Sequence, residues 1–588
     1  MAVRISLTMI VKNEATALPE CLRAARPWVD EIVVVDTGSA DGTPDIARAF
    51  GAQVYEWAWR DDFAAARNES LRHATGDWVL TLDADETLTP GSGPALREAC
   101  QTAPDDVVAY DIKILCPHRD DGGFTQLNWF PRLFRALPGI QWEGVIHEQV
   151  STSFLGRGRV ERSGVAVHHS GYTLSAEEIE AKAARNARLL ERQLHDEPDF
   201  APGWFHLAET YAYQGRVDEA IGAYRKCLRL LFLSRLTLST GMVAVTLQNL
   251  GVTILKHRDE AEGLRLIHDA LVVDPDLAPA HVHLGNHALR KQRWEEAEEH
   301  FTTALACVER QRELATYEIS PWLIHLFQGQ ALAHQQRWAE AIAAFEESRR
   351  LNPDNVDTLR LQARAVASTG DWSRVLEILD RLRELGDDGR AFHLQRIMAL
   401  SSLQRFPEAA DACGAALAQE PDSAPVLALL GESLARAGRP AEAAQTYERL
   451  TRVTPEAPGP WLALAQTFET LGDRSRMVAA YHRAVEIAPE SPDVLFALGA
   501  GCLRADQLEP ALECLTAAIA AAPDRPQFHL HHVLCLVKLG EIAEAALALT
   551  AVRERWPDLN EAQELEPIVA RLSAASPPPA ATVGAERS

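Results

Sequence analysis

The chain has 588 residues, of which 47% are hydrophobic and 24% are charged, as in ordinary globular proteins. At this length we expect three or four domain-sized units rather than one compact core. The 83 acidic residues outnumber the 58 basic ones and give a formal net charge of −25. This balance argues against a protein that binds nucleic acid or an anionic membrane through basic patches.

The first residues and the cysteines bear on the compartment. Met1–Leu7 leads directly into a strand-like run, without a secretory h-region and a small-residue cleavage site. We find no uninterrupted apolar segment of the roughly 18–20 residues that span a bilayer. The nine cysteines include no Cys-x-x-Cys pair, and scattered thiols in a large chain fit a reducing compartment. We therefore expect a cytoplasmic protein with no transmembrane segment.

Residues 1 to about 170 alternate short apolar runs with helix-like stretches. This alternation predicts right-handed crossovers and a mostly parallel sheet, which is an α/β domain. From Val107 to His169, shorter strands and loops predict a mixed sheet edge and a further lobe. The predicted strands are Ile5–Val11, Glu31–Val35, Gln53–Trp57 and Trp78–Leu82, and the predicted helices are Ala15–Ala25, Thr43–Phe50 and Phe63–His73.

Polar residues follow the first two strands, at the edge where ligands bind in parallel sheets. Lys12-Asn13-Glu14 comes at the end of the first strand, and Asp36 ends the second. A carboxylate at the position of Asp36 can accept from a ribose hydroxyl or a base N–H, so we assign Asp36 to a nucleotide. The turn that follows carries residues that we interpret as caps and turn formers, namely Ser39, Asp41 and Thr43.

The third predicted helix carries Asp62 just before its start and Arg67 one turn past Phe63. Asp62 either reads the edge of a base or caps the helix, and the two interpretations are evenly balanced. Arg67 has a planar fork that can pair with a diphosphate or a carboxylate, and a purely structural salt bridge is the alternative.

The most informative stretch is Gly76–Glu86. An apolar run suited to a strand buried on both faces ends there in Asp83-Ala84-Asp85-Glu86. Carboxylates at that place can hold a divalent cation, and the cation can neutralise a diphosphate. A solvated turn would tolerate the same acids, and the upstream residues favour the metal–diphosphate interpretation.

Together these motifs resemble the family-2 glycosyltransferases, which adopt the GT-A fold. The resemblance covers roughly residues 4–90, through Val-Lys-Asn-Glu, Val-Val-Asp-x-Gly-Ser-x-Asp-Gly-Thr, Ala-Arg-Asn and Asp-x-Asp, and residues 128–172 more loosely. It implies an inverting enzyme that uses a nucleotide-sugar, above all a UDP-sugar, with Mn²⁺ or Mg²⁺. It also implies that Glu14 and Asp36 contact uridine or its equivalent. Asp83 would then serve the ribose and Asp85 the metal.

The second half of this domain contains the expected base and a further ligand. An inverting transfer needs a carboxylate or imidazole to take the acceptor proton, and the resemblance suggests Glu148 for this role, although the family's usual Glu-Asp pair is absent. His147 is a ligand, a base or a packed histidine. Relatives often complete the metal shell with a late histidine, and His169, in His-x-Gly-Tyr, fits better than His168. A diphosphate contact or a structural role is the alternative for His169.

From about residue 201 the pattern is helical, with a period of 34 residues. Repeats start at 390, 424, 458, 492 and 526, with earlier units near 201, 244, 278, 322 and 356. Small residues recur where two helices approach, aromatic residues fill the space beside them, and proline ends each unit. This pattern matches the tetratricopeptide repeat, and about ten such units predict an all-α right-handed superhelix with a concave groove. The small residues are Ala409, Ala443, Met477, Ala511 and Ala545.

The order of the two parts is similar to a bacterial subgroup that includes peptide S-glycosyltransferases. We expect a glycosyltransferase domain at 1–175, a junction helix at 176–200, repeats at 201–560, and a terminal helix and disordered tail at 561–588. The groove would recruit a peptide or protein acceptor or an assembly partner. Two alternatives remain: an enzyme that acts on a lipid-linked or cell-surface glycan, and a repeat scaffold whose nucleotide-binding domain is not catalytic.

Overall fold

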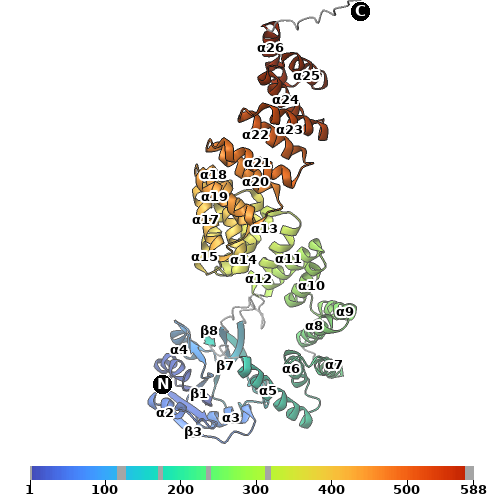
Figure 1. Cartoon of the computed structure of the whole chain (residues 1–588). Helices are drawn as coiled ribbons and strands as arrows, with labels where there is room; N and C mark the ends of the chain where they lie inside the picture. The colour runs from blue at the N-terminus through green and yellow to red at the C-terminus, as the bar shows by residue number, and fades with distance from the viewer. Residues whose placement is uncertain (1–2, 116–126, 170–175, 234–239, 312–319, 576–588) are drawn as a thin grey trace, which may run out of the picture. The chain divides into compact units, whose positions relative to one another are not determined.

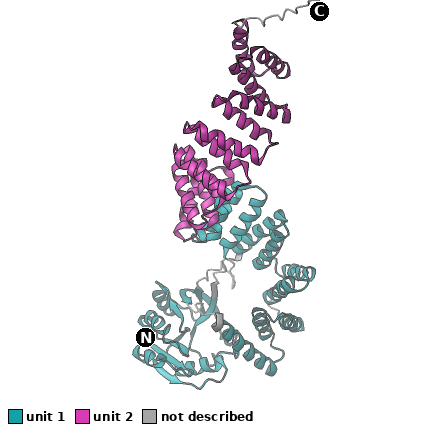
Figure 2. Cartoon of the chain, viewed as in Figure 1, with its two compact units in different colours: residues 1–365 teal, residues 366–588 magenta. Residues whose placement is uncertain are grey.

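The computed structural model describes residues 3–115, 127–169, 176–233, 240–311 and 320–575. The chain separates into two compact units, residues 1–365 and 366–588, which are coloured in Figure 2. This division falls within the helical repeats, because the first helix pairs pack in the same unit as the α/β domain.

The α/β domain is built on one eight-stranded sheet in the order β3-β2-β1-β4-β7-β6-β8-β5 (Figure 1). The strands β3, β2, β1 and β4 are parallel, and the antiparallel strand β7 begins the mixed half. The sequence therefore predicted both the parallel half and the mixed edge. The strands are β1 Ile5–Val11, β2 Glu31–Asp36, β3 Gln53–Glu56, β4 Trp78–Thr81, β5 Glu86–Leu88, β6 Val107–Leu115, β7 Leu127–Arg135 and β8 Arg159–His169.

Both faces of the sheet are covered, because alternate residues of each buried strand point to opposite sides. Trp78 and Leu80 of β4 belong to one core cluster, together with side chains of α1, α2 and α4. Val79 belongs to a second cluster with Ala64 of α3 and Trp142. The helices are α1 Leu18–Ala25, α2 Thr43–Ala49, α3 Phe63–His73 and α4 Ser92–Thr102, and short 3₁₀ turns lie at Arg26–Trp28 and Ser151–Phe154.

A long helix, α5 (Ala176–Asp196), joins the sheet domain to the repeats. Among the described residues, ten helix pairs follow, from α6 with α7 to α24 with α25. The first six pairs are α6 Ala201–Tyr213, α7 Val217–Leu233, α8 Thr240–His257, α9 Glu260–Val273, α10 Ala278–Arg290, α11 Trp294–Gln311, α12 Pro321–His334, α13 Trp338–Leu351, α14 Val356–Thr369, α15 Trp372–Glu384, α16 Arg390–Ser402 and α17 Phe406–Gln419. The last are α18 Ala424–Arg436, α19 Pro440–Val453, α20 Pro458–Thr470, α21 Arg474–Ile487, α22 Pro492–Arg504, α23 Leu508–Ala521, α24 Pro526–Leu539, α25 Ile542–Arg555 and the single helix α26 Asn560–Ala575.

The predicted period of 34 is reproduced in the helices, since α16, α18, α20, α22 and α24 begin at 390, 424, 458, 492 and 526. Tight crossing is visible at Gly431 of α18, where an added Cβ would lie 2.5 Å from Cε1 of Tyr447 on α19. The residues predicted at the crossings, four alanines and one methionine, are all buried (Ala409, Ala443, Met477, Ala511 and Ala545). Glycine and alanine thus set the helix spacing, and the aromatic ring fills the remaining space.

Two of the predicted features fall partly outside the described residues. The spacing of 43 residues between the predicted units near 201 and 244 exceeds the period of 34; the extra residues include part of α7 and α8, and residues 234–239 between them are not described. Most of the tail predicted to be disordered, 576–588, is likewise outside the described residues.

Among the described residues, no helix has the length and apolar character needed to cross a membrane.

Candidate functional site

The candidate site lies where β1, β2 and β4 end, because parallel strands bring their carboxyl ends to one edge of the sheet. Asp36 is the last residue of β2, and Glu14 follows β1 by three residues. Asp83 and Asp85 lie in the turn between β4 and β5. The sheet therefore gathers acids that are up to about seventy positions apart in the sequence.

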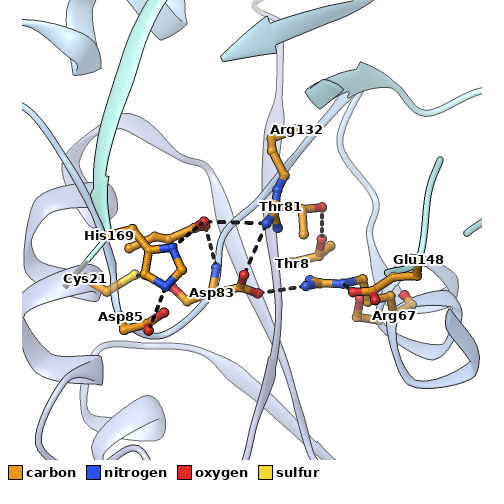
Figure 3. Close-up of polar contacts among 11 residues, drawn as sticks. Thr8, Cys21, Arg67, Thr81, Asp83, Asp85, Arg132, Glu148 and His169 are labelled. Atoms are coloured by element: carbon orange, nitrogen blue, oxygen red, sulfur yellow. Dashed lines mark hydrogen bonds and ion pairs between the residues drawn. The ribbon is translucent and has the colours of Figure 1, made fainter. Parts of the chain in front are cut away.

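Asp85 and His169 meet through the register of β5 on β8. Glu86 pairs with His169 across this antiparallel ladder, which brings the imidazole beside the turn. Nε2 of His169 lies 3.0 Å from Oδ2 of Asp85, as Figure 3 shows. His168 pairs with Thr87 and is exposed. The structure thus brings together the two predicted metal ligands, Asp85 and His169, and their metal-binding role stays a prediction.

Asp83 lies between two guanidinium groups (Figure 3). Nη2 of Arg67 donates to Oδ1 at 2.7 Å, and Nη2 of Arg132 donates to Oδ2 at 3.1 Å. Burial alone would raise the pKa of Asp83, but Arg132 and Arg67 hold it well below its usual range. Asp83 is therefore ionised at any physiological pH.

Arg132 of β7 was not predicted from the sequence, and Glu86 of β5 was named in the acidic run without a role of its own. Arg132 also approaches Glu86, at 3.4 Å, and Oε2 of Glu86 accepts from the backbone N–H of Asp83 at 2.8 Å. Burial raises the pKa of Glu86, although Arg132 counters the effect. One signal existed: Arg132 interrupts the apolar run Trp129–Phe134, and a charge inside a buried strand needs a partner.

Arg67 and Glu148 form the second ion pair of the site. Nε of Arg67 donates to Oε1 of Glu148 at 2.6 Å, and both side chains are largely buried, with exposures of 6% and 12%. Burial would lower the pKa of Arg67, but the charges of Asp83 and Glu148 raise it. Both predicted catalytic residues therefore lie in one cluster with Asp83, and the guanidinium pairs with carboxylates in this structure.

The segment Trp142–Gln149 that carries Glu148 is tied to α3. The amide of Asn68 donates to the Trp142 carbonyl at 2.9 Å and accepts from the Trp142 N–H at 2.8 Å. The backbone N–H of Phe63 donates to the Val145 carbonyl at 2.9 Å. The Ala-Arg-Asn motif thus holds this segment in two ways. Asn68 bonds the backbone of Trp142, and Arg67 bonds the carboxylate of Glu148.

Asp62 caps α3, since its side chain accepts from the backbone N–H of Ala65 at 2.9 Å. This is the structural one of its two predicted roles, and contact with a nucleotide base stays a prediction. Capping offsets the unpaired N–H groups of the first turn.

Asp36 ends β2 in a turn that satisfies only one of its oxygens. Oδ1 accepts from the backbone N–H groups of Gly38 and Ser39, both at 2.9 Å. Oδ2 is buried and has no hydrogen-bond partner within the described residues. The other polar residues of this turn have structural partners, mostly in the segment that follows β1. Ser39 accepts from the Asn13 N–H at 2.9 Å, Thr43 accepts from the Glu14 N–H at 2.8 Å, and Asp41 accepts from the Thr43 N–H at 3.0 Å.

The pKa of Glu14 is raised by its surroundings. Burial first, and then the charges of Asp85, Asp83 and Asp41, raise the pKa of Glu14 to about 7. The part of this shift that follows burial comes from the negative charges of the neighbouring acids. A divalent cation or a basic ligand group would relieve it.

His147 precedes Glu148 and has a left-handed backbone, with φ 53°. Its ring stacks on His206 of α6, with 4.2 Å between ring centroids and 22° between planes. Loss of hydration beside neighbouring protein atoms lowers the pKa of His147, and the charges of His206 and Lys182 lower it further. His147 is an exposed residue, and its stacking partner belongs to the first repeat.

Residues 6–163 match the family model described as Glycosyl transferase family 2. Models described as Tetratricopeptide repeat match 201–231, 332–397, 401–467, 458–501 and 503–560. Both matches agree with the fold, since the first spans the sheet of the α/β domain and the others lie on the helix pairs.

Several named proteins are similar to the first part of the chain. The "TPR repeat-containing protein Synpcc7942_0270" of Synechococcus elongatus is 36% identical over 205 residues, which is 34% of this chain and 50% of that protein. The "SPbeta prophage-derived glycosyltransferase SunS" of Bacillus subtilis is 26% identical over 234 residues, 38% of this chain and 53% of that protein. The "Uncharacterized glycosyltransferase RP128" of Rickettsia prowazekii is 28% identical over 263 residues, 40% of this chain and 89% of that protein.

The chain thus spans about half the length of the Synechococcus and Bacillus relatives, at 50% and 53%. The sheet order, the acids at its edge and the family match agree on the N-terminal part, and the 34-residue helix pairs agree with the repeat matches. The chain thus carries a domain at residues 6–163 that matches Glycosyl transferase family 2, and tetratricopeptide repeats follow that domain.

Proposed function

We propose that this protein is a metal-dependent, inverting glycosyltransferase that moves a sugar from a nucleotide-sugar, specifically a UDP-sugar, to an acceptor recruited by its repeats. The observation that carries the proposal is the pairing of Asp85 with His169, at 3.0 Å, in the acidic turn beyond β4. A carboxylate and an imidazole at this edge suit a divalent cation that also binds a diphosphate.

The residues fit such a cation if the diphosphate supplies the remaining ligands. The described residues hold no cluster of three or more His, Cys, Asp or Glu that would bind a metal alone. Mg²⁺ and similar ions commonly use one or two carboxylates plus substrate phosphates. The pKa of Glu14, raised first by burial, is raised further by the charges of Asp85 and Asp83, and a cation beside these acids would offset that second contribution. When bound, Mn²⁺ or Mg²⁺ would neutralise charge on the departing diphosphate.

The nucleoside is assigned to Asp36, Glu14, Asp83 and Asp62. The buried Oδ2 of Asp36, which lacks a partner within the described residues, can accept from a base N–H or a ribose hydroxyl. Asp83 is 30% exposed, and its oxygens can each accept a further hydrogen bond from the ribose. Asp62 uses Oδ1 as a cap, which leaves its other oxygen for a base edge.

Glu148 is the base in this proposal. Arg67 occupies Oε1, so we assign the acceptor proton to Oε2. The acceptor atom loses this proton as it bonds to the anomeric carbon from the face opposite the diphosphate. The bond between the anomeric carbon and the diphosphate oxygen breaks, and its electron pair leaves with the diphosphate. Nη1 of Arg67, buried and without a partner in the described ranges, is the donor that we assign to the diphosphate.

A peptide or protein is the acceptor class that the repeats support best. A cavity of about 660 Å³ lies between α18, α19 and α20, with small side chains beside polar ones such as Gln466 and Thr470. Concave grooves of this kind suit an extended chain. Acceptance of a lipid-linked or cell-surface glycan is the alternative enzyme, and a non-catalytic scaffold is the alternative outside enzymes. The cysteines in the described residues are all free and mostly buried, which supports a reducing compartment such as the cytoplasm.

Calorimetry with UDP and Mn²⁺ tests the proposal on the full chain. We expect the wild-type protein to bind UDP only with Mn²⁺ present. We expect Asp85→Asn to bind UDP no more tightly with Mn²⁺ than without it. Asp105→Asn, an exposed acid of the same domain, is the matched control and should bind as the wild type does. Absence of binding at millimolar UDP with metal would favour the scaffold. Equal binding by Asp85→Asn would remove the metal assignment.

A further inference from the structure

The segment Trp142–Gln149 is held from two sides, and only one of them belongs to the α/β domain. On that side, Asn68 bonds the backbone of Trp142 and Arg67 bonds Glu148. Between its ends the segment is irregular, closed by two backbone hydrogen bonds of 2.9 Å between Glu143 and Gln149. The second side is formed by the first repeat.

Side chains of the first repeat pack on the middle of this segment. Ile146 is buried in one cluster with Leu189 of α5 and Phe205 of α6, and Val145 packs against the same cluster. His147 stacks on His206, with ring centroids 4.2 Å apart. The two residues before Glu148, Ile146 and His147, therefore pack with side chains of helices outside the sheet.

The backbone of His147 makes this contact important for the direction of Glu148. A non-glycine residue in the left-handed region costs conformational free energy, and His147 adopts it at φ 53°. It persists only where neighbouring contacts hold it. Because Glu148 is the next residue, a change at His147 would swing its carboxylate away from Arg67.

The ring of His206 is itself fixed. Nδ1 lies 3.2 Å from Oε2 of Glu209, one turn further along α6. The other carboxylate oxygen of Glu209 accepts from Asn249 of α8 at 3.5 Å. The orientation of His206 thus depends on the first two repeats.

We propose that the first repeat is a structural part of the catalytic centre, with His206 as a positioning residue that fixes the Glu148 segment through His147. The inference rests on the proposed function only for its effect on turnover. The first repeat then has a role other than acceptor recruitment. The stacked imidazoles of His147 and His206 connect this repeat to the Glu148 segment.

Amide hydrogen exchange of residues 142–150 in the full, metal-free chain tests the positioning without any need for catalysis. In His206→Ala we expect exchange in this segment to rise at least tenfold, whereas His206→Phe, which keeps a stacking ring, should remain close to wild type. His73→Ala is the matched control, since His73 also stacks, on Tyr55, but within the α/β domain. Unchanged exchange in His206→Ala, or an equal rise in His206→Phe, would overturn the inference.

Turnover of a UDP-sugar gives the second readout. We expect His206→Ala to lower kcat about tenfold with the affinity for UDP and Mn²⁺ unchanged, and His206→Phe to restore kcat. A double-mutant cycle with His147→Ala should be non-additive, because both changes remove the same contact. Additive losses would overturn the connection between the rings. Full turnover in Glu148→Gln would count against the proposed base and leave the exchange result intact, so the two failures are distinguishable.

Discussion

Arg67 and Glu148, which lie 81 positions apart in the sequence, are joined by a hydrogen bond of 2.6 Å between Nε and Oε1. The same guanidinium donates through Nη2 to Asp83 at 2.7 Å. One cation on α3 therefore connects the turn after β4 to the segment proposed to carry the base. Since the three side chains are largely shielded from water, their mutual charges are weakly screened.

Removal of Arg67 should therefore destabilise the α/β domain. Arg67→Met leaves Glu148 without this cation, while Asp83 keeps Arg132 as its partner, and breaking a buried pair on one side costs about 3–5 kcal/mol. Arg72→Met is the control: Arg72 is 72% exposed and pairs with Glu69, and exposed pairs contribute about 0–1 kcal/mol. Calorimetric unfolding of the full chain measures both. Equal, small shifts in the two variants would mean that the ion pair is not structurally important.

The prediction for Glu148 separates catalysis from folding. The amide oxygen of Glu148→Gln can still accept from Nε of Arg67, so we expect a folded protein with unchanged UDP affinity. A glutamine cannot take the acceptor proton, and loss of a general base lowers kcat by about 10²–10⁴-fold. Steady-state kinetics with a UDP-sugar and calorimetry with UDP give the two quantities. A wild-type kcat in this variant would assign the base elsewhere.

The main lines of the fold could be predicted because each depends on local pattern. Strands such as Ile5–Val11 are apolar runs bounded by turns, and α16 to α24 repeat a spacing of 34 that is written in the sequence. Asp85 and His169 were both named from their motifs. What brings them together, the pairing of Glu86 with His169 across β5 and β8, is a long-range register that no local pattern contains.

The unpredicted parts of the site are contacts between distant segments. Arg132 on β7 and Glu86 on β5 interact although they are 46 positions apart and their strands are not neighbours in the sheet. Asp62 showed two equally good roles in sequence, and only the geometry of Ala65 reveals the cap. The stack of His147 on His206 depends on how the first repeat packs, which the repeat pattern alone does not determine.

The raised pKa of Glu14, about 7 against an ordinary value of 4.5, predicts a pH effect. Between these values the folded protein keeps a proton that the unfolded chain has lost, so this group makes the metal-free protein less stable as pH rises through the window. In Glu14→Gln the contribution disappears. We expect the variant to gain in melting temperature over wild type from pH 4.5 to pH 7 and to keep the gain above it. Thermal unfolding in EDTA measures the difference, and parallel curves would contradict the assigned pKa.

A bound divalent cation should reduce the difference in melting temperature between the wild-type protein and Glu14→Gln. The charges that raise the pKa of Glu14 come from Asp85 and Asp83 after burial itself, and a bound divalent cation would offset them. The same melting curves with Mn²⁺ and UDP should therefore bring wild type and Glu14→Gln closer above pH 7. A gap that is unaffected by ligand would place the cation away from these acids.

Two glycines of the second unit should respond in opposite directions to the same substitution. At Gly431 a Cβ would lie 2.5 Å from Cε1 and 2.6 Å from Cζ of Tyr447, whereas at Gly414 of α17 it would meet nothing within 4 Å. Gly431→Ala overpacks a helix crossing, which costs about 1–3 kcal/mol. Gly414→Ala removes conformational freedom from the unfolded chain and should stabilise the helix by about 0.5–1 kcal/mol.

Urea unfolding of the full chain, followed by hydrogen exchange in α17 to α19, measures both changes. The same spacing joins Gly285 to Phe301 and Gly329 to Phe345, so Gly285→Ala and Gly329→Ala should behave like Gly431→Ala. Because α18 and α19 lie outside the proposed donor site, UDP binding should be unchanged in Gly431→Ala. A neutral or stabilising effect of Gly431→Ala would show that the ring of Tyr447 can move aside, and that glycine is not what sets the spacing of these helices.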